Sequence, residues 1–243
     1  MKYFTVETTT EYAVVIAGGG PTGLMLAGEL ALAGIDVVIV ERRTSQDLDG
    51  SRSGGLHSRT IEVLDQCGIA ERFLSAGQEH PNVGYSGRFL DISDFPTRHN
   101  YVLALWQKDF EPILADWVGE LGVPILRGRE VVGFAQDDTG VNVELSGDTS
   151  LRAEYLVGCD GGRSLVRKAA GIDFPGLDPS TSWMIAEVEM DDEPELGARQ
   201  TAQVRGRCRG TPPLREVPPQ GAEGVAESEH TPSGCARAPL TPL

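Results

Sequence analysis

The strongest constraint on the fold is a cluster of glycines that interrupts an apolar run near the amino terminus, in "EYAVVIAGGGPTGLMLAGEL". Residues 12–17 are apolar and rich in β-branched side chains, as expected of a strand buried on both faces. The following "TGLMLAGELALAG" has the Ala and Leu content of a helix, and "IDVVIVE" indicates a second buried strand. Two parallel strands joined by a helix form a right-handed β-α-β unit. The sequence therefore predicts an α/β fold.

The glycines have the spacing of a dinucleotide-binding loop. Gly18, Gly20 and Gly23 fall in the G-x-G-x-x-G register, directly after a strand and at the start of a helix. The first permits a tight turn, the second lets a pyrophosphate approach the backbone, and the third lets helix and strand pack closely. The pyrophosphate would lie at the helix N-terminus, where free N–H groups favour negative charge.

An acidic residue closes the second strand at the distance that such a loop requires. Glu41 follows Gly18 by 23 positions, and its carboxylate can accept both ribose hydroxyls of an adenosine. A 2′-phosphate would be repelled there, so the spacing favours FAD or NAD over NADP at this site. The alternative is a solvated glutamate at a strand end.

A second candidate site lies in "YLVGCDGGRSLVRKAAG". Asp160 follows an apolar strand and precedes two glycines and a helix start. Its carboxylate could contact a cofactor, or it could cap the helix that follows. The residues alone leave both roles open.

The rest of the chain predicts further helices and a β-meander. The segment "SRTIEVLDQCGIAERFLSAG" indicates a helix broken near Gly68, and residues 107–121 have helical periodicity with Pro112 expected in the first turn. The segment "REVVGFAQDDTGVNVELSGDTSLRAEYLVGCDG" alternates strands with turns, "GGRSLVRKAAG" indicates a short helix, and "TSWMIAEVEMDDE" indicates one more strand.

Composition disfavours several classes of partner and site. The formal charge of −15 argues against binding to nucleic acid or to an anionic membrane surface. The four cysteines and four histidines fall at no metal-ligand spacing, so no metal site is expected. No secretory signal stands at the start, and the cysteine usage favours a cytoplasmic location.

Taken together, the motifs resemble those of the class A FAD-dependent aromatic hydroxylases, the family typified by para-hydroxybenzoate hydroxylase. The resemblance lies in "GGGPTGLMLAGEL…VVIVER", in "SRSGGLHSRTIEVLDQCG", in Gln107, Glu111 and Leu114, and in "YLVGCDGGRSLVRKAAGIDFPG". It is strongest to members that act on polyketide antibiotics. It implies a glutathione-reductase-like FAD-binding Rossmann fold interleaved with part of a substrate-domain sheet.

The resemblance also implies roles for particular residues. The glycine loop would cradle the FAD pyrophosphate through Gly18, Gly20, Pro21, Thr22 and Gly23. Glu41 would bind the adenosine ribose with Arg42 beside it, and Arg52 would pair with the pyrophosphate, for which its planar fork is suited.

Four further positions match the family's FAD contacts. Gln107 would lie near the ribityl chain, the backbone of Val131 would meet the adenine, and Asp160 with Gly161 would serve FAD and the passing NADPH. From the residues alone, Arg42 could equally be a solvated charge, Gln107 a helix cap and Val131 core filling.

By the resemblance, NADPH reduces FAD, dioxygen adds to give a flavin C4a-hydroperoxide, and one oxygen atom enters a small aromatic, polyketide-like or antibiotic-like substrate. This chemistry belongs to the flavin, so we name no catalytic acid, base or nucleophile. Antibiotic biosynthesis or resistance is the expected context. The alternatives are another FAD-dependent reductase of the superfamily and a non-catalytic FAD-binding or ligand-binding fragment.

The resemblance divides the chain into five segments. Residues 1–75 and 105–176 would belong to the FAD-binding domain, 76–104 would begin the substrate-domain sheet, and 177–196 would be an incomplete substrate-domain segment. The family's second FAD motif, Gly-Asp-Ala-Ala-His, is missing. The proline-rich residues 197–243 are expected to be disordered, and we hypothesise that they are read out of frame. Weak FAD retention and little hydroxylase activity would follow.

Overall fold

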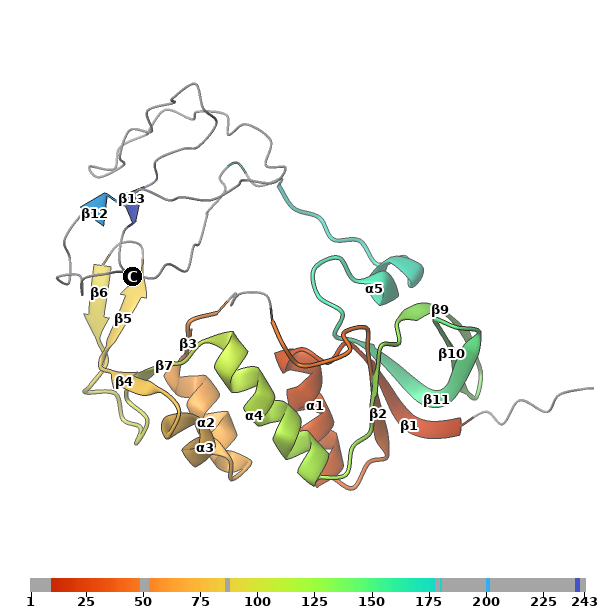
Figure 1. Ribbon diagram of the computed structural model, residues 1–243, viewed down its shortest axis with the longest axis horizontal. Helices are drawn as coiled ribbons and strands as arrows, with labels where there is room; N and C mark the ends of the chain where they lie inside the picture. Colours follow the sequence, from red (N-terminus) through yellow and green to blue (C-terminus); the bar gives the residue numbers. More distant parts are fainter. Residues whose placement is uncertain are drawn as a thin grey trace, which may run out of the picture. The chain divides into compact units, whose positions relative to one another are not determined.

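A computed structural model describes residues 10–48, 53–85 and 88–177, together with residue 180 and the pairs 200–201 and 239–240. The chain divides into two units, residues 1–176 and residues 177–243. In the second unit, the described strands are β12 (Gln200–Thr201) and β13 (Pro239–Leu240), which pair antiparallel. The first unit contains the remaining elements (Figure 1).

The first unit is built on a six-stranded mixed sheet. Its order is β8-β2-β1-β11-β10-β9, and the first four of these strands run parallel. The strands are β1 (Thr10–Ala17), β2 (Val37–Glu41), β8 (Ile125–Arg127), β9 (Val131–Asp137), β10 (Gly140–Leu145) and β11 (Thr149–Gly158). Helix α1 (Pro21–Leu32) connects β1 to β2. The predicted β-α-β unit and α/β fold are confirmed.

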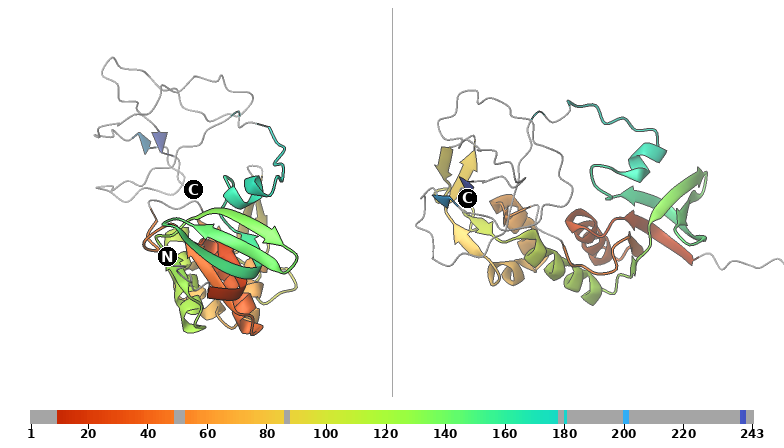
Figure 2. Two further views of the ribbon diagram at one scale, coloured as in Figure 1. Left: turned by 90° about the vertical axis from the view of Figure 1, so that its right-hand side faces the viewer. Right: turned by 45° about the horizontal axis from the view of Figure 1, so that its top comes forward.

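The sheet is buried on both faces in its centre, which explains the unbroken apolar sequence of β1. Successive side chains of a strand point to opposite faces. Val14 and Ile16 accordingly pack in a core with Leu24 of α1 and Trp117, whereas Val15 packs in a second core under the meander. In Figures 1 and 2, α1 and α4 (Gln107–Glu120) run side by side.

The β-meander and the short helix follow the predicted pattern. Strand β10 pairs antiparallel with β9 on one side and with β11 on the other. In the turn between β10 and β11, Gly147 and Asp148 both have positive φ, and the value at Asp148 is 54°. The short helix is α5 (Leu165–Ala169).

Residues 53–104 form two helices and small sheets. Helices α2 (Ser58–Gln66) and α3 (Ala70–Leu74) are separated at Gly68, whose φ of +73° breaks the helix where the sequence predicted. A three-stranded sheet and a hairpin accompany them, made of β3 (Gly55–Leu56), β7 (Val102–Ala104), β4 (Gln78–His80), β5 (Asn82–Tyr85) and β6 (Arg88–Asp91).

Helix α4 begins at Gln107 as expected, but the prediction that Pro112 lies in its first turn is wrong. Pro112 follows the first helical residue by five positions and lies inside the helix. A proline there costs about 3 kcal/mol relative to alanine. The buried side chains of Phe110, Leu114 and Trp117 pack into the core, and this tertiary burial outweighs the local cost.

Two predictions fall on parts of the chain that the structure leaves undescribed. The strand expected in "TSWMIAEVEMDDE" lies outside the described residues. So do residues 197–243, apart from the two short strands of the second unit. Among the helices that the structure does describe, none has the length and apolar character needed to cross a membrane.

Candidate functional site: the edge where three parallel strands end

The carboxyl ends of β2, β1 and β11 meet at one edge of the sheet. The N–H of Gly18 donates to the carbonyl of Val40 at 2.8 Å, and the N–H of Cys159 donates to the carbonyl of Ala17 at 2.8 Å. These bonds bring the glycine loop, the end of β2 and the loop after β11 together. Ligands of open α/β sheets bind in the crevice outside such strand ends.

Each glycine of the loop has a separate steric reason. Gly18 has a φ of +109°, and a Cβ there would lie 2.4 Å from the Cys159 carbonyl oxygen. A Cβ at Gly23 would lie 1.9 Å from the Gly18 carbonyl oxygen, so this glycine lets α1 approach β1. At Gly20 a Cβ would meet nothing within 4 Å. The middle glycine therefore faces open space, whereas the outer two are tightly packed.

The N-terminus of α1 offers free donors beside that open space. Gly20 is the N-cap and Pro21 is the first helical residue, and no side chain caps this end. Thr22 is exposed in the first turn. Uncapped N–H groups and the helix dipole together favour an anion at this position.

Glu41 is a buried carboxylate facing the loop. Its Oε2 accepts from the N–H of Gly19 at 2.6 Å, and its Oε1 accepts from the N–H and the Nε of Arg43 at 2.8 and 3.1 Å. Burial alone would raise the pKa of Glu41, but the Arg43 and Gly19 N–H groups and the Arg43 guanidinium lower it below its usual value. Glu41 is thus held ionised at the loop, and it is not the solvated glutamate of the alternative interpretation.

The arginine that contacts this site is Arg43, which the sequence did not single out. Arg43 Nη2 donates to the Gly19 carbonyl oxygen at 3.2 Å and to Glu111 at 2.6 Å. Arg42, the residue expected beside the ribose, is exposed. Two adjacent arginines look alike in the sequence, and only the direction of the chain after β2 separates them.

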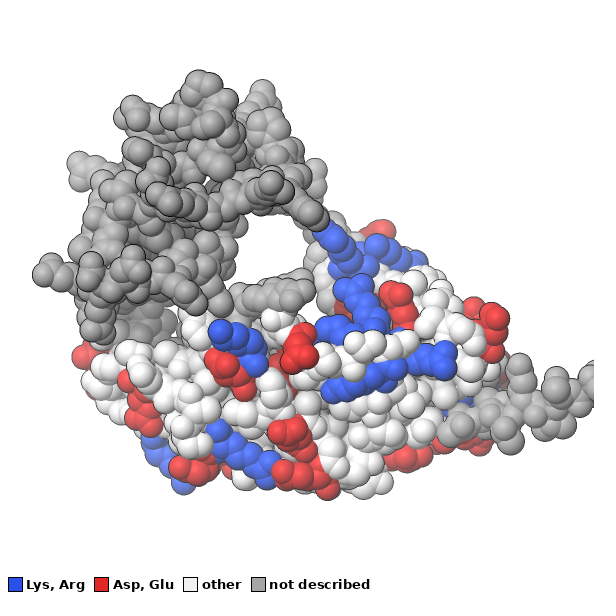
Figure 3. Space-filling view, in the orientation of Figure 1, with Lys and Arg blue, Asp and Glu red and all other residues white. Residues whose placement is uncertain are grey.

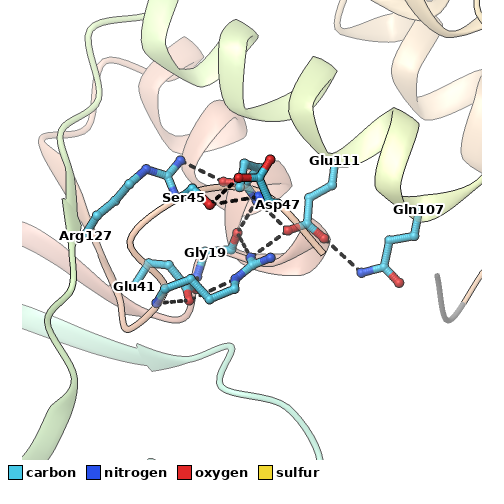
Figure 4. Close-up of polar contacts among 9 residues, drawn as sticks. Gly19, Glu41, Ser45, Asp47, Gln107, Glu111 and Arg127 are labelled. Atoms are coloured by element: carbon cyan, nitrogen blue, oxygen red, sulfur yellow. Dashed lines mark hydrogen bonds and ion pairs between the residues drawn. The ribbon is translucent and has the colours of Figure 1, made fainter. Parts of the chain in front are cut away.

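Glu111 of α4, which the sequence indicated only as part of the family resemblance, is the centre of a polar network that the sequence did not predict. Its side chain is fully buried and accepts from Arg43, from Gln46 and, at 2.8 Å, from Gln107 Nε2. Arg127 of β8 joins the network by donating to Gln46 Oε1 at 2.7 Å. Figure 4 shows Gly19, Glu41, Glu111 and Gln107 arranged across this network. No local motif signals these long-range contacts.

Gln107 and Val131 lie where their elements begin. Gln107 is the first residue of α4, and its side chain bonds Glu111 whereas the helix itself has no side-chain cap. Val131 is the first residue of β9 and is buried in the core under the meander. Its side chain is core filling, and a backbone contact with adenine stays a prediction.

Asp160 caps the helix that follows it. Its Oδ2 accepts from the N–H groups of Leu165 and Val166 at 2.6 and 3.2 Å. Burial would raise the pKa of Asp160, but the Ser164 hydroxyl and the helix N–H groups lower it overall. Gly161 beside it is exposed, with a φ of +80°. Capping is therefore observed, and a cofactor contact stays a prediction.

Positive side chains gather near the loop that follows β11, although the chain as a whole is acidic. Figure 3 shows Lys and Arg side chains over α5, whose last turn carries Arg167 and Lys168. Such a local field favours a negatively charged ligand. Arg52, the predicted partner of the pyrophosphate, lies outside the described residues.

Comparison with known proteins shows the family to which this chain belongs. The profile of the family described as FAD binding domain matches residues 11–208. The chain belongs to this FAD-binding family. The membership expected from its motifs is confirmed, as is the glutathione-reductase-like, interleaved fold that came with it.

The proteins that this chain is similar to include a monooxygenase and a hydroxylase. The chain is 44% identical over 228 residues to rifampicin monooxygenase of Streptomyces venezuelae, covering 89% of this chain and 47% of that protein. The structure of OxyS anhydrotetracycline hydroxylase from Streptomyces rimosus has a TM-score of 0.68 at 44% identity, covering 70% of this chain and 36% of that one.

A third similar structure is of the flavin-dependent monooxygenase PieE in complex with FAD and substrate. Its TM-score is 0.61 at 28% identity, and the match covers 69% of this chain and 33% of that one. The chain thus spans less than half the length of these relatives.

The residues at the strand ends fit FAD. The open space at Gly20 and the uncapped start of α1 suit a pyrophosphate, and the ionised Glu41 suits ribose hydroxyls. Three buried atoms in this region, Arg43 Nη1, Arg127 Nη1 and Asp160 Oδ1, have no hydrogen-bond partner among the described residues. They are two donors and one acceptor, which the polar groups of a dinucleotide could satisfy.

Proposed function

We propose that this chain forms the nucleotide-binding part of an FAD-dependent monooxygenase that hydroxylates an aromatic, polyketide-like substrate. NADPH is the proposed reductant and dioxygen the proposed oxidant. The observation that supports it most is Glu41, ionised and bonded to Gly19, in a chain of the FAD-binding family. The substrate class comes from the similar anhydrotetracycline hydroxylase and rifampicin monooxygenase.

The chain's own residues have limited tasks in this function. The N–H groups at the start of α1 bind the pyrophosphate, and Glu41 accepts hydrogen bonds from the adenosine ribose. Arg43, held by Glu41 and Glu111, keeps the loop closed against β2. When bound, the flavin supplies the redox and oxygen-transfer chemistry.

The chain spans less than half the length of these relatives, and the strength of its FAD binding and its hydroxylase activity stay predictions. A location in the cytoplasm likewise stays a prediction from cysteine usage.

Titration with FAD tests the proposal. We expect the native protein to quench flavin fluorescence until the signal saturates, and ADP to compete with FAD. The Glu41→Ala variant should show no saturation. Oxygen uptake with NADPH, stimulated by a phenolic substrate, supports a monooxygenase, and NADPH oxidation without oxygen uptake favours a reductase. A folded protein that binds NAD but does not bind FAD would contradict the proposal.

A further inference from the structure

In the function proposed above, the buried carboxylate of Glu111 serves only as a partner that holds Arg43. It lies on α4, away from the glycine loop in sequence, and its side chain is fully buried. A buried charge is retained only when it is paired and its lone pairs are satisfied. The partners of Glu111 therefore indicate what it is for.

The two carboxylate oxygens hold different groups. Oε1 accepts from Arg43 Nη2 at 2.6 Å and also from the Gln46 side-chain amide. Oε2 accepts from Gln107 Nε2 at 2.8 Å. One side of the carboxylate thus contacts the residues after β2, and the other contacts the start of α4.

The first set of contacts fixes the glycine loop. The Arg43 nitrogen that pairs with Glu111 also donates to the Gly19 carbonyl oxygen, and Arg43 Nε donates to Glu41. Gln46 donates to the same Gly19 carbonyl at 3.1 Å. Glu111 therefore holds both donors that pin Gly19, next to the glycine that faces open space.

The second contact fixes the orientation of an amide. An ionised carboxylate only accepts hydrogen bonds, so Gln107 must turn its NH₂ group toward Glu111. Its carbonyl oxygen then points away from Glu111, as Figure 4 shows. Gln107 is partly exposed, so this oxygen is available to accept from a hydroxyl of a ligand. Figure 4 also shows Glu41 and Gln107 on opposite sides of Glu111.

We propose that Glu111 is a positioning residue that sets both halves of the FAD site. Through Arg43 and Gln46 it fixes the loop that binds the adenosine diphosphate half, and through Gln107 it presents an acceptor to the flavin half. This inference rests on the proposed FAD function. Because Glu41 and Gln107 lie on opposite sides of Glu111, the half of FAD that ADP lacks would be the half that meets Gln107.

The test compares FAD and ADP affinities of two variants. Glu111→Gln places an NH₂ group where only acceptors fit, and we expect FAD to bind about 10–100-fold more weakly, since hydrogen bonds to charged groups contribute about 1.5–3 kcal/mol. We expect a smaller loss for ADP. Gln107→Leu should lower the affinity for FAD by about tenfold and leave the affinity for ADP within about twofold of the wild type. The visible circular dichroism of bound FAD should change in both variants.

A matched control lies on the same helix. Glu120 is exposed and forms a two-bond ion pair with Arg72 at 2.7 and 2.8 Å, remote from the network. Glu120→Gln should leave both affinities unchanged. In the Gln107→Leu background, Glu111→Gln should weaken FAD binding less than it does in the wild type. A purely structural role of Glu111 would give the same loss in both backgrounds.

The outcomes separate this inference from the proposed function. If the wild type fails to bind FAD, the proposed function is wrong and the inference falls with it. If the wild type binds FAD and folded Glu111→Gln stays within about twofold, the inference alone is overturned. Should Glu111→Gln not fold, Gln107→Leu carries the test, and an unchanged FAD affinity in that variant overturns the inference.

Discussion

Two glycines three positions apart in one loop serve different purposes. Gly20 faces open space, whereas Gly23 is pressed against the backbone of Gly18. A methyl group added at Gly20 meets only the ligand, and one added at Gly23 meets the protein. The glycine loop is therefore a place where binding and folding can be separated by single substitutions.

We expect Gly20→Ala to keep the stability of the wild type and to lose FAD affinity, because the new Cβ stands in the path of the pyrophosphate. Gly23→Ala should lower the free energy of unfolding by about 1–3 kcal/mol, because the helix must shift to make room. Urea unfolding and FAD titration of both variants measure the two effects. Equal stability losses in both would contradict this division.

The ionisation of Glu41 makes part of the stability depend on pH. Its folded-state pKa is lowered, because the loop N–H groups and Arg43 outweigh the effect of burial. A lowered pKa gives stability that is complete above the unfolded-state pKa, about 4.3 for glutamate, and is lost as the pH falls through the folded-state value.

Glu41→Gln should therefore cost about 1–3 kcal/mol at neutral pH and progressively less below about pH 4. Urea unfolding at a series of pH values measures the difference between variant and wild type. Glu130→Gln, which changes an exposed carboxylate, serves as the control and should differ little at any pH. A difference for Glu41→Gln that stays constant with pH would refute the assignment.

At the scale of elements, the close approach of α1 and α4 brings Glu111 to the glycine loop. A Cβ added at Gly28 of α1 would lie 2.1 Å from Trp117 Cζ3 of α4. Gly28 and Trp117 are both buried. The indole ring thus occupies the space left by the missing side chain, and this packing sets the distance between the helices.

Gly28→Ala should destabilise the protein by about 1–3 kcal/mol, because the ring and the new methyl group cannot share the space. Combined with Trp117→Leu, it should cost less than the sum of the single changes, since the smaller residue relieves the clash. Gly119→Ala on α4 is the control: its Cβ meets nothing within 4 Å, and helix propensity should stabilise the protein by up to about 1 kcal/mol. Thermal unfolding of the four variants tests this, and additive single effects would contradict it.

What the sequence predicted depended on local patterns. The glycine loop, the break at Gly68 and the carboxylate that ends β2 each follow from residues close together in the chain. The bond between Arg43 and Glu111 joins residues 68 positions apart and has no local signal. Pro112 was misplaced because propensity alone ignores the core burial that keeps α4 helical across it.

At the scale of the whole molecule, the site couples ligand binding to folding. The loop after β1, the end of β2, the loop after β11 and the start of α4 all contribute to it, and these segments assemble only in the folded chain. A ligand that binds the folded state alone stabilises it by mass action, by about 2.7 kcal/mol at a concentration 100 times its Kd.

FAD should therefore raise the Tm by about 5–10 °C at such a concentration, since 1 kcal/mol corresponds to about 2–4 °C for a chain of this size. ADP should give a smaller rise and riboflavin the smallest at equal concentration, because the contacts of the glycine loop and Glu41 serve the adenosine diphosphate half. Differential scanning calorimetry over a series of ligand concentrations measures the order. A larger shift with riboflavin than with ADP would mean that the flavin half, rather than the loop, dominates binding.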